Sequence, residues 1–214
     1  MDFQALSAAV QKGKVKEVKS LVNQALEENT PVKDILEDGL IAPMAIVGDN
    51  FSANKIFVPE MLMAARAMSA GVKIIEPLFS ESGIEPIGTV VIGTVKGDLH
   101  DIGKNLVSMM MRGAGLSVYD IGIDVPDERF VEKAEELNAD IVALSALLTT
   151  TMPAIGDVIR EFERRGVRDK YHIMIGGAPV TQAFAEEVHA DCYTVNAADA
   201  AKHAKEYLIK RKAG

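Results

Sequence analysis

The chain is poor in several residue types, and each shortage narrows what the protein can be. It has one cysteine, Cys192, and no tryptophan among 214 residues, so an intrachain disulfide is excluded. The formal net charge of −8 argues against a nucleic-acid partner, because such proteins usually carry a basic face. No apolar stretch is long enough to cross a bilayer, and no apolar run follows a basic start as in a signal peptide. We therefore expect a cytoplasmic protein with no membrane partner.

The spacing of apolar residues changes near Pro86 and divides the chain into two predicted domains. Before Pro86, apolar residues recur every three or four positions, which is typical of amphipathic helices. This pattern predicts four helices, at residues 5–10, 15–26, 31–47 and 58–72. The third predicted helix contains Pro43, where we expect a kink. Because four such helices bury their apolar stripes best against one another, we expect a four-helix bundle over residues 1–85.

After Pro86, strand and helix patterns alternate. Short runs rich in valine and isoleucine predict five strands, at Thr89–Val95, Ser117–Ile123, Asp140–Ala146, His172–Gly176 and Cys192–Val195. Helical patterns follow each of them, at Ile102–Gly113, Asp127–Leu137, Met152–Arg165, Thr181–Val188 and Ala198–Lys210. Apolar strands that alternate with helices predict a parallel sheet covered on both faces. Right-handed crossovers favour the flavodoxin-like strand order, so residues 86–214 are predicted to form a Rossmann-like α/β domain.

The turn after the first predicted strand concentrates residues that can bind a ligand. Its core is the pattern Asp98-x-His100-x-x-Gly103, preceded by Gly97. This turn lies at the carboxyl edge of the predicted sheet, where α/β proteins bind their ligands. A histidine beside a carboxylate is a common metal ligand with its orienting partner. A loop histidine is more often an ordinary surface residue, however, and glycines can simply form turns, so this turn does not identify a function by itself.

Three further loops should meet the first turn at the same edge. They are Ser145–Thr151, Gly176-Gly177-Ala178 and Asn196-Ala197. Hydroxyl groups can bind a polar ligand, and small residues allow a bulky group to lie against the backbone. Helix capping and close packing explain the same residues equally well. A phosphate site is less favoured, because the first turn lacks the glycine-rich phosphate motifs. Together, the four loops favour a crevice for a slender organic group that ends in a metal near His100.

These motifs resemble those of a known family. Residues 86–214 resemble the cobalamin-binding domain of methionine synthase and of the small corrinoid proteins of methyltransferase systems, and residues 1–85 resemble the helical cap domain that precedes it there. The most specific part is Asp98-Leu99-His100-Asp101-Ile102-Gly103-Lys104-Asn105, and the cap contributes Phe57–Met68. Where methionine synthase has serine, this chain has Thr151, which retains the hydroxyl group.

The resemblance implies a cobamide cofactor, cobalamin or a related corrinoid, with His100 as the lower axial ligand of its cobalt. Asp98 would accept a hydrogen bond from the other imidazole nitrogen, and Thr151 would extend this relay. The neighbouring cofactor-binding residues would be Gly97, Leu99, Asp101, Ile102 and Gly103. The slot for the nucleotide tail would be lined by Ser145, Leu147, Thr149, Gly176, Gly177, Asn196 and Ala197. The upper face of the cofactor would be covered by Met61, Leu62 and Ala65, although such a stripe is equally typical of a bundle core.

The same resemblance implies a methyl carrier without a catalytic residue of its own. It would accept a methyl group on cobalt from a substrate-specific methyltransferase and pass it to a second methyltransferase acting on tetrahydrofolate or a thiol. A reductive activase would be a further partner. The alternatives are a cobamide-dependent mutase subunit, disfavoured by the cap, and a cobamide-sensing regulator, which would need a DNA-binding domain. A flavodoxin-like binding module lies outside this class, and the absorbance of the purified protein would distinguish it.

Overall fold

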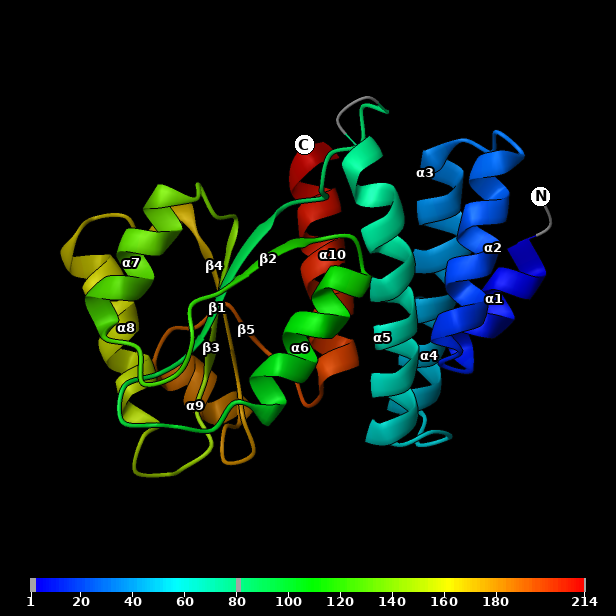
Figure 1. Ribbon diagram of the computed structural model, residues 1–214. Helices are drawn as coiled ribbons and strands as arrows, with labels where there is room; N and C mark the ends of the chain where they lie inside the picture. Colours follow the sequence, from blue (N-terminus) through cyan, green and yellow to red (C-terminus); the bar gives the residue numbers. More distant parts are fainter. Residues whose placement is uncertain (1–2, 80–81, 214) are drawn as a thin grey trace. The chain divides into compact units, whose positions relative to one another are not determined.

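The computed structural model describes residues 3–79 and 82–213, which form two compact units (Figure 1). The first unit holds the helical part of the chain up to Pro86 together with Gly113–Gly115. The second unit holds the remainder, from Ile87 onward. No helix within these described ranges is long and apolar enough to cross a membrane.

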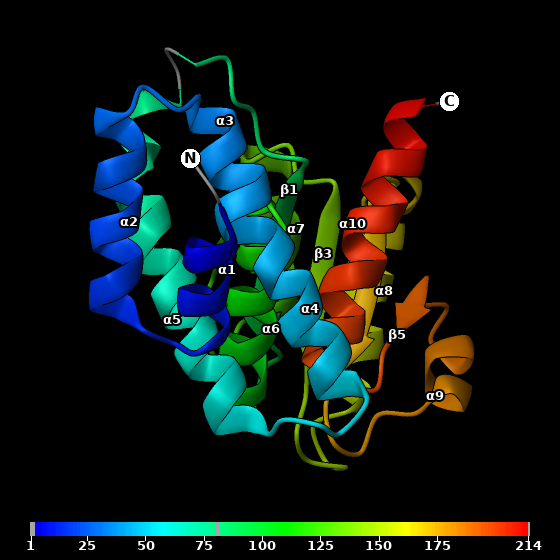
Figure 2. The ribbon, with the colours of Figure 1, turned by 90° about the vertical axis from the view of Figure 1, so that its right-hand side faces the viewer.

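The first unit is helical, as the sequence predicts (Figure 2). Its elements are α1 (Phe3–Gln11), α2 (Val15–Glu27), α3 (Val32–Asp34), the π-helix η1 (Ile35–Ile41), α4 (Ala42–Ser52), α5 (Val58–Ile75) and the 3₁₀ helix η2 (Glu76–Leu78). Helices α1, α2, α4 and α5 pack against one another, and Leu6, Val18 and Val22 have no exposed surface. Helix α5 has Pro59 in its first turn, and the Glu60 carboxylate there accepts a hydrogen bond from the Phe57 amide at 3.0 Å.

The third predicted helix differs from the prediction in one respect. The irregularity lies before Pro43, as the π-helical turn η1, and α4 then contains Pro43 in its first turn. Proline has no N–H to donate, and its ring would collide with the carbonyl four residues earlier, that of Gly39. The wider π turn lets the chain enter α4 without that hydrogen bond.

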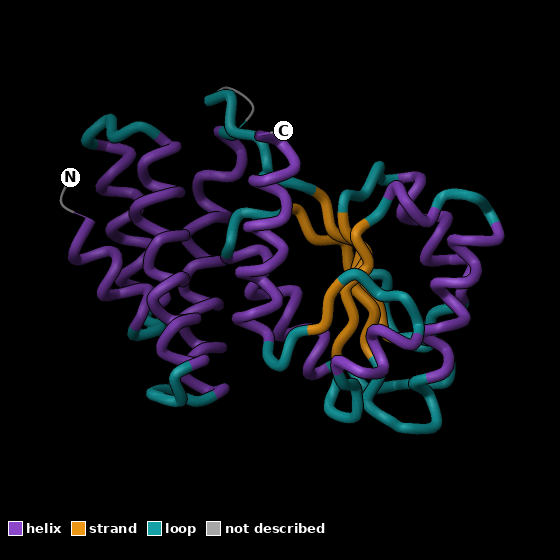
Figure 3. Tube along the Cα trace, turned by 180° about the vertical axis from the view of Figure 1, so that it is seen from behind, coloured by secondary structure: helices purple, strands orange, loops and turns teal. Residues whose placement is uncertain are grey.

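The second unit is a five-stranded, wholly parallel sheet with the strand order β2-β1-β3-β4-β5. This is the predicted flavodoxin-like order. The strands are β1 (Thr89–Thr94), β2 (Ser117–Asp120), β3 (Ile141–Ser145), β4 (His172–Gly176) and β5 (Cys192–Tyr193). The helices are α6 (Ile102–Gly113), α7 (Asp127–Glu136), α8 (Pro153–Arg164), η3 (Arg168–Lys170), α9 (Gln182–Glu187) and α10 (Ala197–Ala213). Helices α7 and α8 cover one face of the sheet, and α6 and α10 cover the other (Figures 1 and 3).

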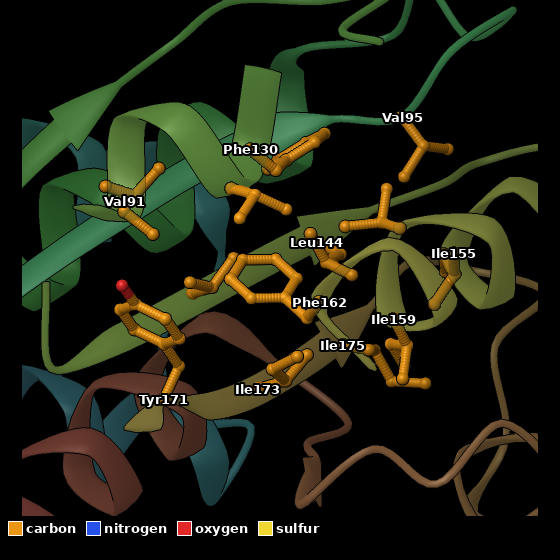
Figure 4. Packing of buried hydrophobic residues seen from close by; sticks show 14 of the residues in the cluster. Val91, Val95, Phe130, Leu144, Ile155, Ile159, Phe162, Tyr171, Ile173 and Ile175 are labelled. Atoms are coloured by element: carbon orange, nitrogen blue, oxygen red, sulfur yellow. The ribbon is translucent and has the colours of Figure 1, made fainter. Parts of the chain in front are cut away.

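An apolar core joins the sheet to α7 and α8 (Figure 4). Alternate residues of the strands, such as Val142 and Ile173, point into it and meet Phe130 and Phe162 from the helices. The rings of Phe162 and Tyr171 pack edge to face with their centroids 5.2 Å apart. Each large apolar side chain buried in this way contributes roughly 1.5–3 kcal/mol. The core therefore gives a rigid base to the loops at the carboxyl edge of the sheet, the lower edge in Figure 1.

Candidate functional site

The turn between β1 and α6 is held in place by hydrogen bonds from its neighbours. The Thr94 hydroxyl donates to the His100 carbonyl at 2.9 Å. The Gly97 amide donates to Asp124 Oδ1 at 2.7 Å, and Gly97 has a φ of +81°, a conformation that favours glycine. The Val95 amide donates to the Ser145 carbonyl of β3 at 3.0 Å. The turn is thus fixed by protein contacts on both sides.

Asp98 is the centre of the turn, and its side chain has no exposed surface. Its Oδ1 accepts hydrogen bonds from His100, from the backbone amide at 3.0 Å and from the ring Nδ1 at 2.7 Å. Its Oδ2 accepts from the Thr151 hydroxyl at 2.6 Å and from the Leu147 and Leu148 amides at 2.7 and 3.3 Å. The carboxylate therefore joins the β1–α6 turn to the loop after β3.

These hydrogen bonds keep Asp98 ionised. Burial alone would raise the pKa of Asp98, but the hydrogen bonds from Thr151, Leu147 and His100 outweigh it and hold that pKa well below its usual range. An ionised carboxylate can only accept hydrogen bonds. The Nδ1 of His100 must therefore carry a hydrogen when it meets Asp98.

The protonation of Nδ1 determines what the rest of the His100 ring can do. In the neutral ring, a hydrogen on Nδ1 leaves a lone pair on Nε2. The His100 side chain is 49% exposed, and no hydrogen bond reaches Nε2 from the described residues. A histidine held by a carboxylate in this way presents Nε2 as a metal ligand of increased basicity.

Two glycines near His100 leave open space, whereas a third does not. A Cβ added to Gly103 or to Gly176 would meet no heavy atom within 4 Å. At Gly177, which has a φ of +139°, an added Cβ would lie 1.8 Å from the Ala146 carbonyl oxygen. Gly177 is therefore required for the close approach of the loops after β3 and β4. Gly103 and Gly176 have no such structural reason, and they leave room for a ligand beside the backbone.

Six exposed apolar side chains lie in the segments that follow the carboxyl ends of the strands. We call them the apolar rim: Leu99, Ile102, Ile123, Leu147, Leu148 and Val195, all of which are exposed. Ile102 and Val195 are 79% and 80% exposed. All six follow the carboxyl ends of strands or begin the helix after one. Because exposed apolar side chains at the carboxyl edge of a parallel sheet are available for contact with a ligand, the rim is compatible with a ligand that has a large apolar surface.

The structure also locates the remaining residues predicted for the site. Ser145 ends β3 and is partly buried, Thr149 is exposed in the following turn, and Asp101 is exposed and accepts a hydrogen bond from the Asn105 amide group at 3.0 Å. Asn196 caps α10, because its Oδ1 accepts from the Asp199 amide at 2.9 Å, and Ala197 is buried at the start of that helix. Their contact with a cofactor stays a prediction.

The three predicted lid residues lie on α5, in the first unit. Met61 and Ala65 are fully buried and Leu62 is partly buried. Their contact with a cofactor also stays a prediction. Three contributors to the site were not predicted from the sequence: Thr94, Asp124 and the backbone amide of Leu148. Asp124 could have been noticed as an acidic residue shortly after the second predicted strand. The Leu148 amide could not, because a backbone donor is independent of the residue type.

The strand order, the Asp98–His100 pair and the apolar rim are features expected of an α/β protein that binds a metal-bearing cofactor. Residues 88–204 match the B12 binding domain family, and residues 3–76 match a second family of the same description. The chain belongs to the B12-binding family, and it binds a corrinoid.

Similar proteins support this assignment over the whole chain. Dimethylamine corrinoid protein 1 of Methanosarcina acetivorans is 48% identical over 207 residues, which are 96% of this chain and 97% of that protein. The crystal structure of the methanol:cobalamin methyltransferase complex MtaBC from Methanosarcina barkeri matches with a TM-score of 0.87 and 30% identity, over 97% of this chain and 79% of that chain. A cobalamin-binding protein from Desulfitobacterium hafniense DCB-2 matches with a TM-score of 0.81 and 28% identity, over 97% and 98% of the two chains.

The residues at the carboxyl edge fit a corrinoid. A corrinoid is broad, largely apolar and centred on cobalt, so it needs a metal ligand, apolar contacts and open space. His100 Nε2 supplies a free nitrogen, the apolar rim supplies contacts, and Gly103 and Gly176 leave space that a Cβ would fill.

Proposed function

We propose that the protein is the corrinoid methyl carrier of a methyltransferase system and that His100 Nε2 is the lower ligand of its cobalt. The observation that carries the assignment of His100 is the hydrogen bond of 2.7 Å between Asp98 Oδ1 and His100 Nδ1. It leaves the lone pair of the half-exposed ring on Nε2. When bound, the corrinoid supplies a cobalt ion that takes up and gives away a methyl group.

The residues of the chain hold and tune that cofactor. Asp98 fixes the tautomer and the orientation of the His100 ring. Thr151 and the Leu147 amide fix Asp98 in turn. The apolar rim, together with Ser145, Thr149, Gly176 and Asn196 of the neighbouring loops, receives the rest of the cofactor. No nucleophile or general base is required of the protein, because the cofactor carries the chemistry and the protein orients it.

We further propose that the methyl group comes from a methylated amine. Several relatives that match over nearly the whole chain are dimethylamine corrinoid proteins, at 44–48% identity. One methyltransferase would load the carrier, and a second would move the methyl group to tetrahydrofolate or a thiol. A reductive activase would restore the cofactor after accidental oxidation.

The assignment of His100 is tested with His100→Ala in the full chain. The variant should fold and retain corrinoid. It should lose the coupling to a histidine nitrogen in the electron paramagnetic resonance spectrum of the Co(II) form. Growth of the wild-type protein with ¹⁵N-histidine identifies the coupling nitrogen as one from histidine and not from the cofactor's own base. His189→Asn is the matched control, since it removes a histidine elsewhere in the same unit. Unchanged histidine coupling in His100→Ala would refute the assignment.

The methyl donor is tested separately. The carrier is mixed with methyltransferases specific for dimethylamine, monomethylamine or methanol, and methylation is followed by the absorbance of the corrinoid. We expect the fastest loading with dimethylamine and its enzyme. Loading from methanol alone would refute the amine proposal and leave the role of His100 unaffected.

A further inference from the structure

A second group of possible metal ligands lies in the α/β unit, away from the carboxyl edge. It consists of His172, the first residue of β4, Cys192, the first residue of β5, and His203 in α10. One ligand atom from each side chain lies within 4.8 Å of the others. We call these three residues the His-Cys-His cluster. Since β4 rises by about 3.3 Å per residue, His172 lies roughly 13 Å along the strand from Gly176 at the carboxyl edge.

The register of the sheet explains why the three side chains meet. His172 and Met174 are two positions apart on β4, so they point to the same face of the sheet. Cys192 pairs with Met174 across the β4–β5 ladder and shares that face. Helix α10 covers this face, opposite α7 and α8 (Figures 1 and 3), and its His203 side chain meets His172 and Cys192.

The distances within the cluster are close to those of a metal site. The Nε2 atoms of His172 and His203 are 3.0 Å apart. Two nitrogens bound to one tetrahedral Zn²⁺ at about 2.0–2.1 Å lie roughly 3.3 Å from each other. Cys192 is the only cysteine of the chain, is unpaired and is 8% exposed. A buried thiol beside two imidazole nitrogens is a ligand set that suits zinc and related borderline-soft ions.

Asp191 and Tyr207 lie beside the His172 ring. Asp191 Oδ2 lies 4.0 Å from His172 Nδ1, on the side of the ring away from Nε2, and also accepts hydrogen bonds from Arg168 and from the Ile173 amide. Tyr207 of α10 stacks on the His172 ring with the centroids 3.9 Å apart.

A hydrogen bond between the two rings is the simpler explanation of the 3.0 Å distance, but it does not account for the thiol. With one ring donating and the other accepting, both Nε2 atoms are satisfied, and Cys192 has no role in the contact. A cation accounts for all three side chains.

We propose that the His-Cys-His cluster binds one divalent cation of the zinc class, through His172 Nε2, His203 Nε2 and Cys192 Sγ, with water in the fourth position. On binding, the Cys192 thiol loses its proton to solvent and the thiolate bonds to the metal, so one proton is released per ion. The ion would join β4, β5 and α10. Because β5 has only two residues in the ladder, this bond would fix an edge strand that few backbone hydrogen bonds hold.

The proposal is tested on the full chain with its corrinoid, produced without a histidine tag. Zn²⁺ affinity is measured by competition with a chromogenic chelator, and bound zinc by elemental analysis. We expect one zinc per chain. Because changes beyond the ligands already weaken metal sites by about 10–100-fold, Cys192→Ser and His203→Gln should each weaken binding by at least about 100-fold. His189→Asn, which removes a histidine outside the cluster, should bind zinc like the wild-type protein.

A second measurement needs no variant. X-ray absorption at the zinc edge of the wild-type protein should show one sulfur at about 2.3 Å and nitrogens at about 2.0–2.1 Å. Since Cys192 is the only cysteine, a sulfur ligand identifies it directly. Zinc at 100 times its Kd should also raise the Tm by about 5 °C or more. Absence of stoichiometric zinc, a zinc environment without sulfur, or equal affinity in the wild type and Cys192→Ser would each overturn the proposal.

Discussion

Replacing Asp98 by asparagine tests the proposal that Asp98 prepares His100 to bind cobalt. Asparagine has nearly the same shape as aspartate, but it has one acceptor oxygen and one donor NH₂ group. If its oxygen takes the place of Oδ2, it keeps the bonds from Thr151, Leu147 and Leu148. Its NH₂ group then faces the two donors of His100, the backbone amide and Nδ1. Nδ1 can meet the NH₂ group only as an acceptor, which moves the ring hydrogen to Nε2. We therefore expect Asp98→Asn to lose the lone pair on Nε2.

The magnitude follows from the bonds that change. The His100 backbone amide loses its acceptor in a partly buried site, at about 1–3 kcal/mol, and the Thr151 and Leu147 bonds change from a charged to a neutral acceptor, at about 1 kcal/mol each. The total is about 3–5 kcal/mol. Because domains of this kind are stable by about 5–15 kcal/mol, we expect the variant to remain folded and to hold corrinoid.

The assay is paramagnetic resonance of the Co(II) form together with urea unfolding. Asp98→Asn should show weak or absent histidine coupling and a loss of unfolding free energy in the calculated range. Asp101→Asn is the matched control, because it removes the same charge from the same turn, but Asp101 is exposed and bonds only to Asn105 among the described residues. Full histidine coupling in Asp98→Asn, or equal losses in the two variants, would refute the tautomer argument.

Three further predictions concern the stability of the site. The native pKa of Asp98 lies below its unfolded value, so the ionised Asp98 stabilises the folded protein fully above about pH 5. This stabilisation is lost as the pH falls, with a slope of up to about 1.4 kcal/mol per pH unit. Acid unfolding of the wild type and of Asp98→Asn should show this difference, and parallel curves would contradict it. Gly177→Ala should destabilise the folded protein by about 2–5 kcal/mol through overpacking and backbone strain. Gly176→Ala should change the stability by less than about 0.5 kcal/mol but weaken corrinoid binding. Urea unfolding and corrinoid titration distinguish the two variants, and equal stability losses would refute the assignment of open space at Gly176. Lys104→Met should cost about 1–3 kcal/mol, because the buried Lys104 ammonium pairs with Asp120; an unchanged urea midpoint would show that the pair contributes nothing.

The sequence predicted the fold well where the pattern of apolar residues is set by the core. Helix α6 and strand β4 have the predicted bounds, Ile102–Gly113 and His172–Gly176. The predicted strands run too long at the carboxyl edge, since β2 ends at Asp120 and β5 at Tyr193. The apolar residues beyond these ends include Ile123 and Val195, which are exposed members of the apolar rim. Exposed apolar residues after a strand have the same composition as the buried strand itself, so the sequence pattern could not distinguish the end of the strand from the loop that follows it.

The site itself was predictable only in part, for a different physical reason. Asp98 and His100 are two residues apart in one turn, so their proximity follows from the sequence itself. Their partner Thr151 was implied by the family resemblance. The amides of Leu147 and Leu148 are backbone donors and leave no mark in the sequence. The His-Cys-His cluster joins residues from three separate elements, with no local spacing to reveal it. Only the register of β4 and β5 and the position of α10 bring these side chains together.

The hydrogen bonds of Asp98 imply that the turn is formed before any cofactor arrives. All five donors to this carboxylate belong to the protein: two come from His100 in the loop after β1, and three come from Leu147, Leu148 and Thr151 in the segment after β3. Binding therefore does not have to order Asp98 or select the tautomer of His100. Since less ordering on binding leaves more of the interaction free energy for affinity, these hydrogen bonds favour the proposed binding of cobalt by His100.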